Sequence, residues 1–231
     1  MTILSISTSS TICAVAILED FSIIKEITLD NGLTHSETLM PMINEILKES
    51  KLNLTDIDLI TCDIGPGSFT GIRIGIATAK AFCDSLGIKA IGVSSLEALC
   101  YNINSNNIVC SLIDARKENI YCQISENIQG NYILRRNASF ENIDLFLSEL
   151  KNMKLKYDIT FVGDGSINYK NKILEYLPNS NFADINNISA GNIGKCGYTL
   201  FNKKELKDLT PLYLRKTQAE QVLEDKLNGA K

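Results

Sequence analysis

The sequence predicts an α/β protein of two structurally similar lobes, in which mixed sheets are flanked by helices. The order three strands, helix, strand, helix occurs twice along the 231 residues. The two copies are offset by about 105 residues, which is close to the size of a small lobe. In each copy, consecutive strands predict an antiparallel meander, and the later alternation of strand and helix predicts parallel crossovers.

The first copy occupies residues 1–104 and is expected to form the N-terminal lobe. A helix is predicted across 36–50 because its apolar residues recur at helical spacing. Short apolar runs and their turns predict the other elements. These are strands at 2–8, 12–18, 21–29, 57–63 and 88–93, a polar turn at 9–11, and a helix at 70–86.

The second copy, residues 105–187, follows a polar joint at 102–107. The sequence predicts strands at 108–114, 118–125, 131–137 and 158–163, and helices at 141–150, 167–177 and 188–203. The last helix, near 188–204, is expected to return to the N-terminal lobe. Residues 217–231 are polar and predict a tail that is either a frayed helix or disordered.

Composition narrows the classes of function. The formal net charge is −4 and the sequence pI is about 5.2, which does not predict a protein that holds nucleic acid by itself. Basic residues form small groups, and none alternates with aromatic residues along the sequence as in a stacking platform.

The cysteines and the apolar runs of the sequence indicate the cellular compartment in which we expect the protein. Most of the seven cysteines lie inside apolar runs and none forms a CxxC pair, which is typical of reduced, buried thiols in the cytoplasm. The chain enters an apolar strand at once, without a basic leader, and has no long apolar stretch. We therefore expect neither a signal peptide nor a membrane span.

The most informative motif is the glycine loop, residues 63–75, between a buried strand and a helix. Glycines there permit positive φ or close backbone approach, and Ser68 or Thr70 can cap the helix. A strand, a glycine loop and a helix N-terminus can present N–H groups to a phosphate, with Arg73 supplying charge. The spacing matches neither a Walker loop nor GxGxxG, so a loop that shapes a lobe or subunit junction is the alternative. Likewise, Asp114 and Arg116 form either a structural ion pair at a strand end or a ligand contact.

Six motifs in order carry a resemblance to a known family. They are Ile3-Leu-Ser-Ile-Ser-Thr-Ser9, His35-Ser-Glu, Gly65-Pro-Gly-Ser-Phe-Thr-Gly-Ile-Arg-Ile-Gly75, Gly92-Val-Ser-Ser-Leu96, Ile113-Asp-Ala-Arg116 and Pro211-Leu-Tyr-Leu-Arg215. Together they closely resemble the TsaB (YeaZ) family, and the glycine loop with its Phe-Thr-Gly-Ile-Arg continuation is the most specific of them. The duplicated layout also resembles the actin-like, acetate and sugar kinase and heat-shock superfamily.

This resemblance implies a non-catalytic, activating subunit of the bacterial machinery that makes threonylcarbamoyladenosine at position 37 of tRNA. It implies pairing through the N-terminal lobe with a paralogous TsaD-type transferase, which a TsaE-type ATPase joins. The chain alone is expected to form a homodimer and to contact tRNA only indirectly. No cofactor of its own is implied, although ATP or ADP can lie at the interface with the paralogue.

The residues themselves argue against catalysis. The chain has one histidine, His35, so an HxxxH metal pair cannot exist, although an all-carboxylate magnesium site stays open. Relatives resembling this chain usually carry Asp where it has Ser7, and a hydroxyl brings no charge for Mg²⁺ and is a weak base. An ATP-dependent phosphotransferase and a nucleotide-sensing module of the same fold are the alternatives.

We assign no catalytic or metal-binding residue. The candidate phosphate-binding residues are Ser7, Thr8, Gly65, Gly67, Ser68, Thr70, Gly71 and Arg73.

The two N-terminal helices supply the candidate partner surface. Small residues recur every fourth position in the helix at 70–86, and its apolar residues cover more than one face, as do those of 36–50. Such helices are buried either in their own lobe or against a second chain. The candidate interface residues are Leu39, Met42, Ile43, Ile46, Ile72, Gly75, Ile76, Ala79 and Cys83. On the second alternative, Ile76→Glu would leave the lobe folded and prevent pairing.

Overall fold

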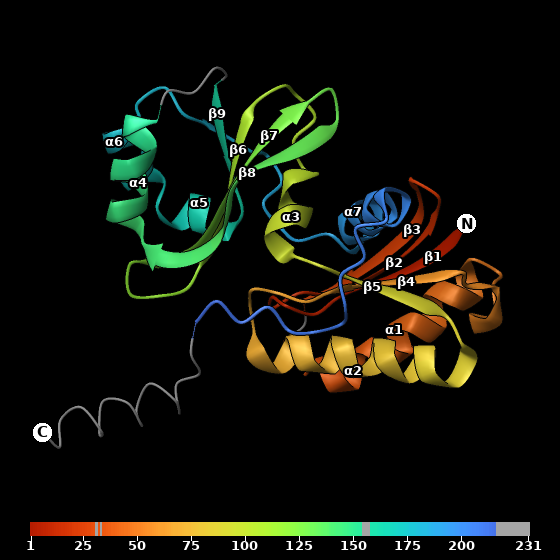
Figure 1. The fold of residues 1–231 in the computed structure, drawn as a ribbon. Helices are drawn as coiled ribbons and strands as arrows, with labels where there is room; N and C mark the ends of the chain where they lie inside the picture. Colours follow the sequence, from red (N-terminus) through yellow and green to blue (C-terminus); the bar gives the residue numbers. More distant parts are fainter. Residues whose placement is uncertain (31, 33, 154–157, 216–231) are drawn as a thin grey trace, which may run out of the picture.

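The computed structural model describes residues 1–30, 32, 34–153 and 158–215 and contains two five-stranded sheets (Figure 1). We call each sheet, with the helices that cover it, a lobe. The tail predicted at 217–231 lies outside the described residues.

The first lobe begins with the predicted meander and continues through alternating helices and strands. Its elements are β1 (Thr2–Ser7), β2 (Cys13–Glu19), β3 (Ser22–Leu29), α1 (His35–Glu49), the 3₁₀ turn η1 (Leu54–Asp56), β4 (Leu59–Asp63), α2 (Phe69–Leu86), β5 (Lys89–Val93) and α3 (Ser95–Cys100).

The second lobe repeats this order. Its elements are β6 (Ile108–Asp114), β7 (Asn119–Ile128), β8 (Asn131–Asn142), α4 (Ile143–Asn152), β9 (Ile159–Val162), α5 (Asp164–Asn168), α6 (Lys170–Tyr176) and β10 (Asn181–Phe182), after which α7 (Ala190–Lys203) follows. The helix predicted at 167–177 is two short helices, because the chain leaves helical geometry at Tyr169 (φ −107°, ψ 17°).

Sheet topology confirms the predicted duplication and fold class. The strand orders are β3-β2-β1-β4-β5 and β10-β9-β6-β7-β8. In each sheet the first three strands in sequence are antiparallel, and the later strands add in parallel beside the first of them. Both copies of the sequence pattern therefore fold into the same mixed sheet.

Alternation along β1 explains how the first sheet is covered on both faces. Leu4 and Ile6 pack in a core with α1 and α2, whereas Ile3 packs in a second core with α7. Helices α1 and α2 lie on one side of this sheet and α7 on the other (Figure 1). The last helix thus covers the first sheet although it follows the second sheet in sequence.

Helix α3, which the sequence pattern missed, lies between the two lobes. Leu96 and Leu99 join the α7 core to residues of the second sheet, including Val109 and Val162. Ser94 caps the helix, since its Oγ accepts a hydrogen bond from Leu96 N. Ser94 and Glu97 also match the spacing of a capping box, and this signal could have found the helix.

No helix in the described ranges has both the length and the apolar content that crossing a bilayer requires.

Candidate functional site

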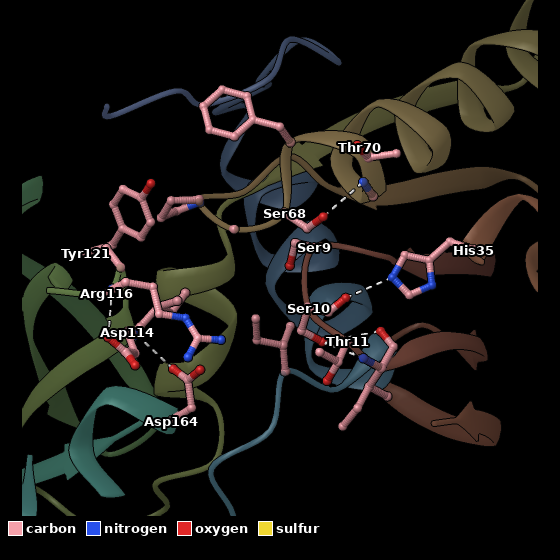
Figure 2. Close-up of a pocket in the computed structure, with 18 of the residues that line it drawn as sticks. Ser9, Ser10, Thr11, His35, Ser68, Thr70, Asp114, Arg116, Tyr121 and Asp164 are labelled. Carbon is pink, nitrogen blue, oxygen red and sulfur yellow. Dashed lines mark hydrogen bonds between the residues drawn. The ribbon is translucent and has the colours of Figure 1, made fainter. Parts of the chain in front are cut away.

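A cleft of about 1140 Å³ opens between the lobes. The first lobe contributes the β1–β2 turn at 9–11, His35 and the glycine loop, and the second contributes Asp114, Arg116 and Asp164 (Figure 2). The cleft is therefore where the two copies of the fold face each other.

The glycine loop is closed onto the β1–β2 turn. Ser68 N donates to Ser9 O at 2.6 Å, Gly65 N to the Asp63 carboxylate at 2.9 Å, and Gly71 N to Ser68 Oγ at 3.2 Å. These three N–H groups have protein acceptors already. A phosphate in the cleft would not meet them without breaking those bonds.

The glycines are required because the backbone of the turn lies against them. A Cβ at Gly71 would overlap Thr8 O, and one at Gly67 would overlap Ser9 O. At Gly75 a Cβ would lie 2.5 Å from Thr8 Oγ1. The small-residue stripe of α2 therefore accommodates the chain's own first hairpin.

A buried carboxyl group, Asp63, joins the loop, the turn and α3. It is fully buried and accepts hydrogen bonds from Ser7 Oγ at 3.0 Å, Ser9 Oγ at 2.5 Å and Ser95 Oγ at 2.6 Å, in addition to Gly65 N. Burial raises the pKa of Asp63 above its usual 3.8, and these hydrogen bonds oppose the shift only in part. The group fixes three segments of the first lobe at one point.

The candidate phosphate-binding residues divide into two groups. Gly67, Ser68, Thr70 and Gly71 line the cleft. The hydroxyls of Ser7 and Thr8 are buried behind the wall, where Ser7 donates to Asp63 and Thr8 donates to Gly71 O at 2.8 Å. Gly65 is buried as well.

Arg73, the predicted source of charge, is directed elsewhere. Its Nε donates to Tyr213 Oη at 2.8 Å, and it is not among the residues that line the cleft. Phosphate binding by this set of residues stays a prediction.

The candidate interface residues belong to the core of the first lobe. Leu39, Met42, Ile43, Ile46, Ile72, Ile76 and Ala79 are at most 5% exposed, Gly75 is buried, and only Cys83 is partly exposed. The expectation that these side chains face a partner is wrong, because α1 and α2 turn them toward each other and toward the first sheet. Both helices need two apolar sides to pack on the sheet and on one another.

The second wall of the cleft presents charge. Arg116 N donates to Asp114 Oδ1 at 2.8 Å, and Asp114 N donates to Asp164 Oδ1 at 3.0 Å. The predicted side-chain ion pair between Asp114 and Arg116 is absent from the described residues, since the contact uses the backbone of Arg116. The Arg116 side chain extends across the cleft toward the β1–β2 turn instead (Figure 2).

Histidine and acidic residues do not converge. His35 Nε2 donates to Ser10 O at 2.8 Å, so the single imidazole holds the β1–β2 turn in place. Over the part of the chain that is described, no three His, Cys, Asp or Glu side chains gather where they could hold a metal ion.

The sequence motifs missed two features of the site. One is Asp63, whose place at the end of a buried strand, two residues before a glycine, was the available signal. The other is the path of the segment 205–215, which contains the motif Pro211-Leu-Tyr-Leu-Arg215 but whose crossing from the first lobe to the second was not predicted. Leu212 N donates to Ile64 O at 2.8 Å, and Arg215 Nη1 donates to Ala115 O at 3.2 Å. No local pattern marks such a crossing.

Known proteins resemble this chain over most of its length. A family model described as TsaD, tRNA N6-adenosine threonylcarbamoyltransferase, matches residues 30–223. A Buchnera aphidicola protein named tRNA threonylcarbamoyladenosine biosynthesis protein TsaB is 31% identical, over 92% of this chain and 97% of its own. A Bacillus subtilis protein of the same name is 30% identical, over 95% and 96% respectively.

The fold has a counterpart among solved structures. YeaZ from Pseudomonas aeruginosa superposes with a TM-score of 0.75 at 24% identity, covering 92% of this chain and 99% of that one. At this identity the likeness shows the shared fold.

Proposed function

The chain belongs to the TsaB (YeaZ) family, and from that premise we propose that it serves tRNA threonylcarbamoyladenosine biosynthesis as a non-catalytic subunit paired with a TsaD-type paralogue. The observation that carries this proposal is the sequence identity of 30% and 31% to relatives of that name over nearly the whole chain.

The closed first wall of the cleft supports a non-catalytic role. An enzyme of this fold would need its loop N–H groups and first hairpin free to bind a phosphoryl group. Here the loop donates to the chain's own carbonyl and carboxylate groups, and Ser7 donates to Asp63. The same contacts make the first lobe a preformed unit, which suits a scaffold.

The surface for the paralogue is then the outer side of α1 and α2. Their inner sides are buried, whereas Met40 is 49% exposed, Leu86 is 41% exposed, and Ala77 and Ala81 are also exposed. In Figure 1 both helices lie on the side of the first sheet opposite α7. Small side chains at Ala77 and Ala81 allow close approach of a partner helix.

Further parts of the proposal follow from the family. We expect a TsaE-type ATPase to join the pair, with ATP or ADP at the interface with the paralogue and none bound by this chain alone. A homodimer through the same outer helix surface is the expected resting state in the cytoplasm.

Reconstitution tests the proposal. The purified chain, the TsaD-type paralogue, and the two together are weighed by light scattering and assayed for transfer of the threonylcarbamoyl group to tRNA. We expect a complex and full transfer only from the mixture. Transfer or magnesium-dependent ATP turnover by the chain alone, at an enzyme's pace, would contradict the non-catalytic role.

A variant pair tests the surface. Ala77→Arg places a bulky charge on the outer side of α2 and should weaken pairing at least tenfold without altering the thermal melting curve. Leu145→Arg, at a 67% exposed position of α4, is the matched control. Pairing by Ala77→Arg as tight as by Leu145→Arg would exclude this surface.

A further inference from the structure

Basic and aromatic side chains from three separate segments lie in the cleft or beside it. Arg116 and Lys117, from the β6–β7 turn, and Arg215, from the segment that crosses the lobes, line the cleft. Arg73, from α2, lies outside the lining but is joined through Tyr213 to Phe69, which lines the cleft. Along the sequence these basic residues stand apart from most of their aromatic neighbours, so the pattern appears only in the folded chain.

Two of these arginines, Arg73 and Arg215, each lie against an aromatic ring. The Arg73 guanidinium carbon is 5.6 Å from the centroid of Tyr213, and that of Arg215 is 5.7 Å from Phe140. Phe69 and Tyr213 stack with centroids 4.6 Å apart and planes inclined by 18°. Tyr213 remains 39% exposed, so one ring of this stack is open to a ligand.

The four cations have no acidic partner. Within the described ranges, neither Arg73, Arg116, Lys117 nor Arg215 forms an ion pair at 4.0 Å or less. Asp30, Asp114 and Asp164 also line the cleft, so its lining holds as many carboxylates as the three cations Arg116, Lys117 and Arg215. Asp114 and Asp164 already accept hydrogen bonds from backbone N–H groups, so the cations are the more available groups for a ligand.

Arg215 also has unused hydrogen-bonding capacity. Its Nη1 donates to Ala115 O, whereas its Nε is buried without a protein acceptor. Arg116 and Lys117 are exposed at the tip of their turn, and the Arg116 guanidinium projects into the cleft (Figure 2).

We propose that this aromatic–basic rim (Phe69, Arg73, Arg116, Lys117, Tyr213 and Arg215) binds an unpaired segment of RNA. Unpaired nucleic acid is held by cations that follow the phosphates and by aromatic rings on which bases stack. The cleft, at about 1140 Å³, exceeds the 300–1000 Å³ typical of small-molecule pockets. The choice of RNA rests on the proposed function, and it goes beyond the expectation that tRNA contacts this subunit only indirectly.

The test is fluorescence anisotropy of a labelled, unpaired RNA oligonucleotide titrated with the isolated full chain between about 50 and 200 mM salt. Arg116→Ala with Lys117→Ala removes two phosphate contacts and should lower the slope of log affinity against log salt by about 1.4. Tyr213→Ala should weaken binding roughly tenfold with the slope unchanged, and Tyr213→Phe should restore it. Lys48→Ala with Lys151→Ala, two exposed lysines away from the cleft, is the matched control and should bind as the wild type does.

Three results would overturn the proposal. They are no binding of the oligonucleotide up to roughly 100 µM chain at the lowest salt, equal binding by the rim variants and the control, and competition by polyglutamate or free ATP as effective as that by unlabelled RNA. Should Tyr213→Ala unfold, the Arg116 and Lys117 variant decides alone, because both side chains are exposed. Pairing with the paralogue is measured separately, so a failure here leaves the scaffold role standing.

Discussion

The β1–β2 turn and the β6–β7 turn occupy equivalent places in the two copies of the fold, yet they are held in different ways. Three hydrogen bonds hold the first turn. Ser9 O accepts from the glycine loop, Ser10 O accepts from His35, and the Ser9 hydroxyl donates to Asp63. In the second, Arg116 and Lys117 have positive φ angles of 69° and 52° and exposed side chains.

This difference shows how a duplicated fold can divide its tasks. The first turn uses its polar groups to fix the inner structure of its own lobe. The second turn is held through its backbone, by Arg116 N at Asp114 Oδ1 and by Asn119 Nδ2 at the carbonyl oxygens of residues 116 and 117, and it leaves its cations to the solvent. The first wall of the cleft, whose polar groups hydrogen-bond to one another, is suited to scaffolding. The second wall, whose described cations form no ion pair, is suited to binding a ligand.

The largest expected effect tests whether the inner side of α2 belongs to the first lobe. Ile76→Glu places a carboxylate in a core where Ile76 is 5% exposed, and it should lower the free energy of unfolding by about 4 kcal/mol or more. Urea unfolding followed by circular dichroism measures it, with Ala77→Glu as the exposed neighbour. A folded Ile76→Glu that fails only to pair would restore the earlier interface prediction.

Gly71→Ala tests whether the glycine loop is packed against the β1–β2 turn. Helix propensity and steric overlap predict changes of opposite sign in the free energy of unfolding. Helix propensity alone predicts stabilisation by about 1 kcal/mol. The overlap of the new Cβ with Thr8 O predicts destabilisation by about 3 kcal/mol, since backbone must move. Thr70→Ala, at the exposed position before it, is the control for the urea midpoint. An unchanged or raised midpoint for Gly71→Ala would mean that the turn is not held as described.

Asp63→Asn tests the buried acid through pH. The raised pKa means that the folded protein binds more protons than the unfolded chain from about pH 3.8 up to the shifted pKa. The free energy of unfolding of the wild type should therefore fall, relative to that of Asp63→Asn, as the pH rises through this window. At neutral pH we expect Asp63→Asn to cost about 1–3 kcal/mol, because four donors must share an amide. A pH-independent difference between the two proteins would contradict the shift.

Arg116→Ala gives the smallest expected effect and completes the comparison. Its exposed side chain makes no ion pair in the described structure, so the free energy of unfolding should change by less than about 0.5 kcal/mol. Differential scanning calorimetry measures it beside Gly71→Ala. A loss comparable to that of Gly71→Ala would show that both turns are structural.

The architecture could be predicted because it follows from local patterns. Strand runs, the helical spacing at 36–50 and the duplication of element order all depend on neighbouring residues. Which side of α2 faces outward could not be predicted, because Ile76 and Ala77 are both apolar or small and only tertiary contacts distinguish them. The aromatic–basic rim could not be predicted for a related reason, because Arg73, Arg116 and Tyr213 are far apart in the sequence. Asp63 was visible as a residue, but its three serine partners come from distant segments.

The return of α7 to the first sheet has a consequence during synthesis on the ribosome. Until residues 190–203 emerge, the face of the first sheet that carries Ile3 and Leu18 has no helix to cover it. The last strand of the second lobe ends at Phe182, so this lobe can fold before α7 is available to complete the first lobe. Truncation ahead of α7 should thus yield a nascent chain with an uncovered apolar sheet, a substrate for chaperones.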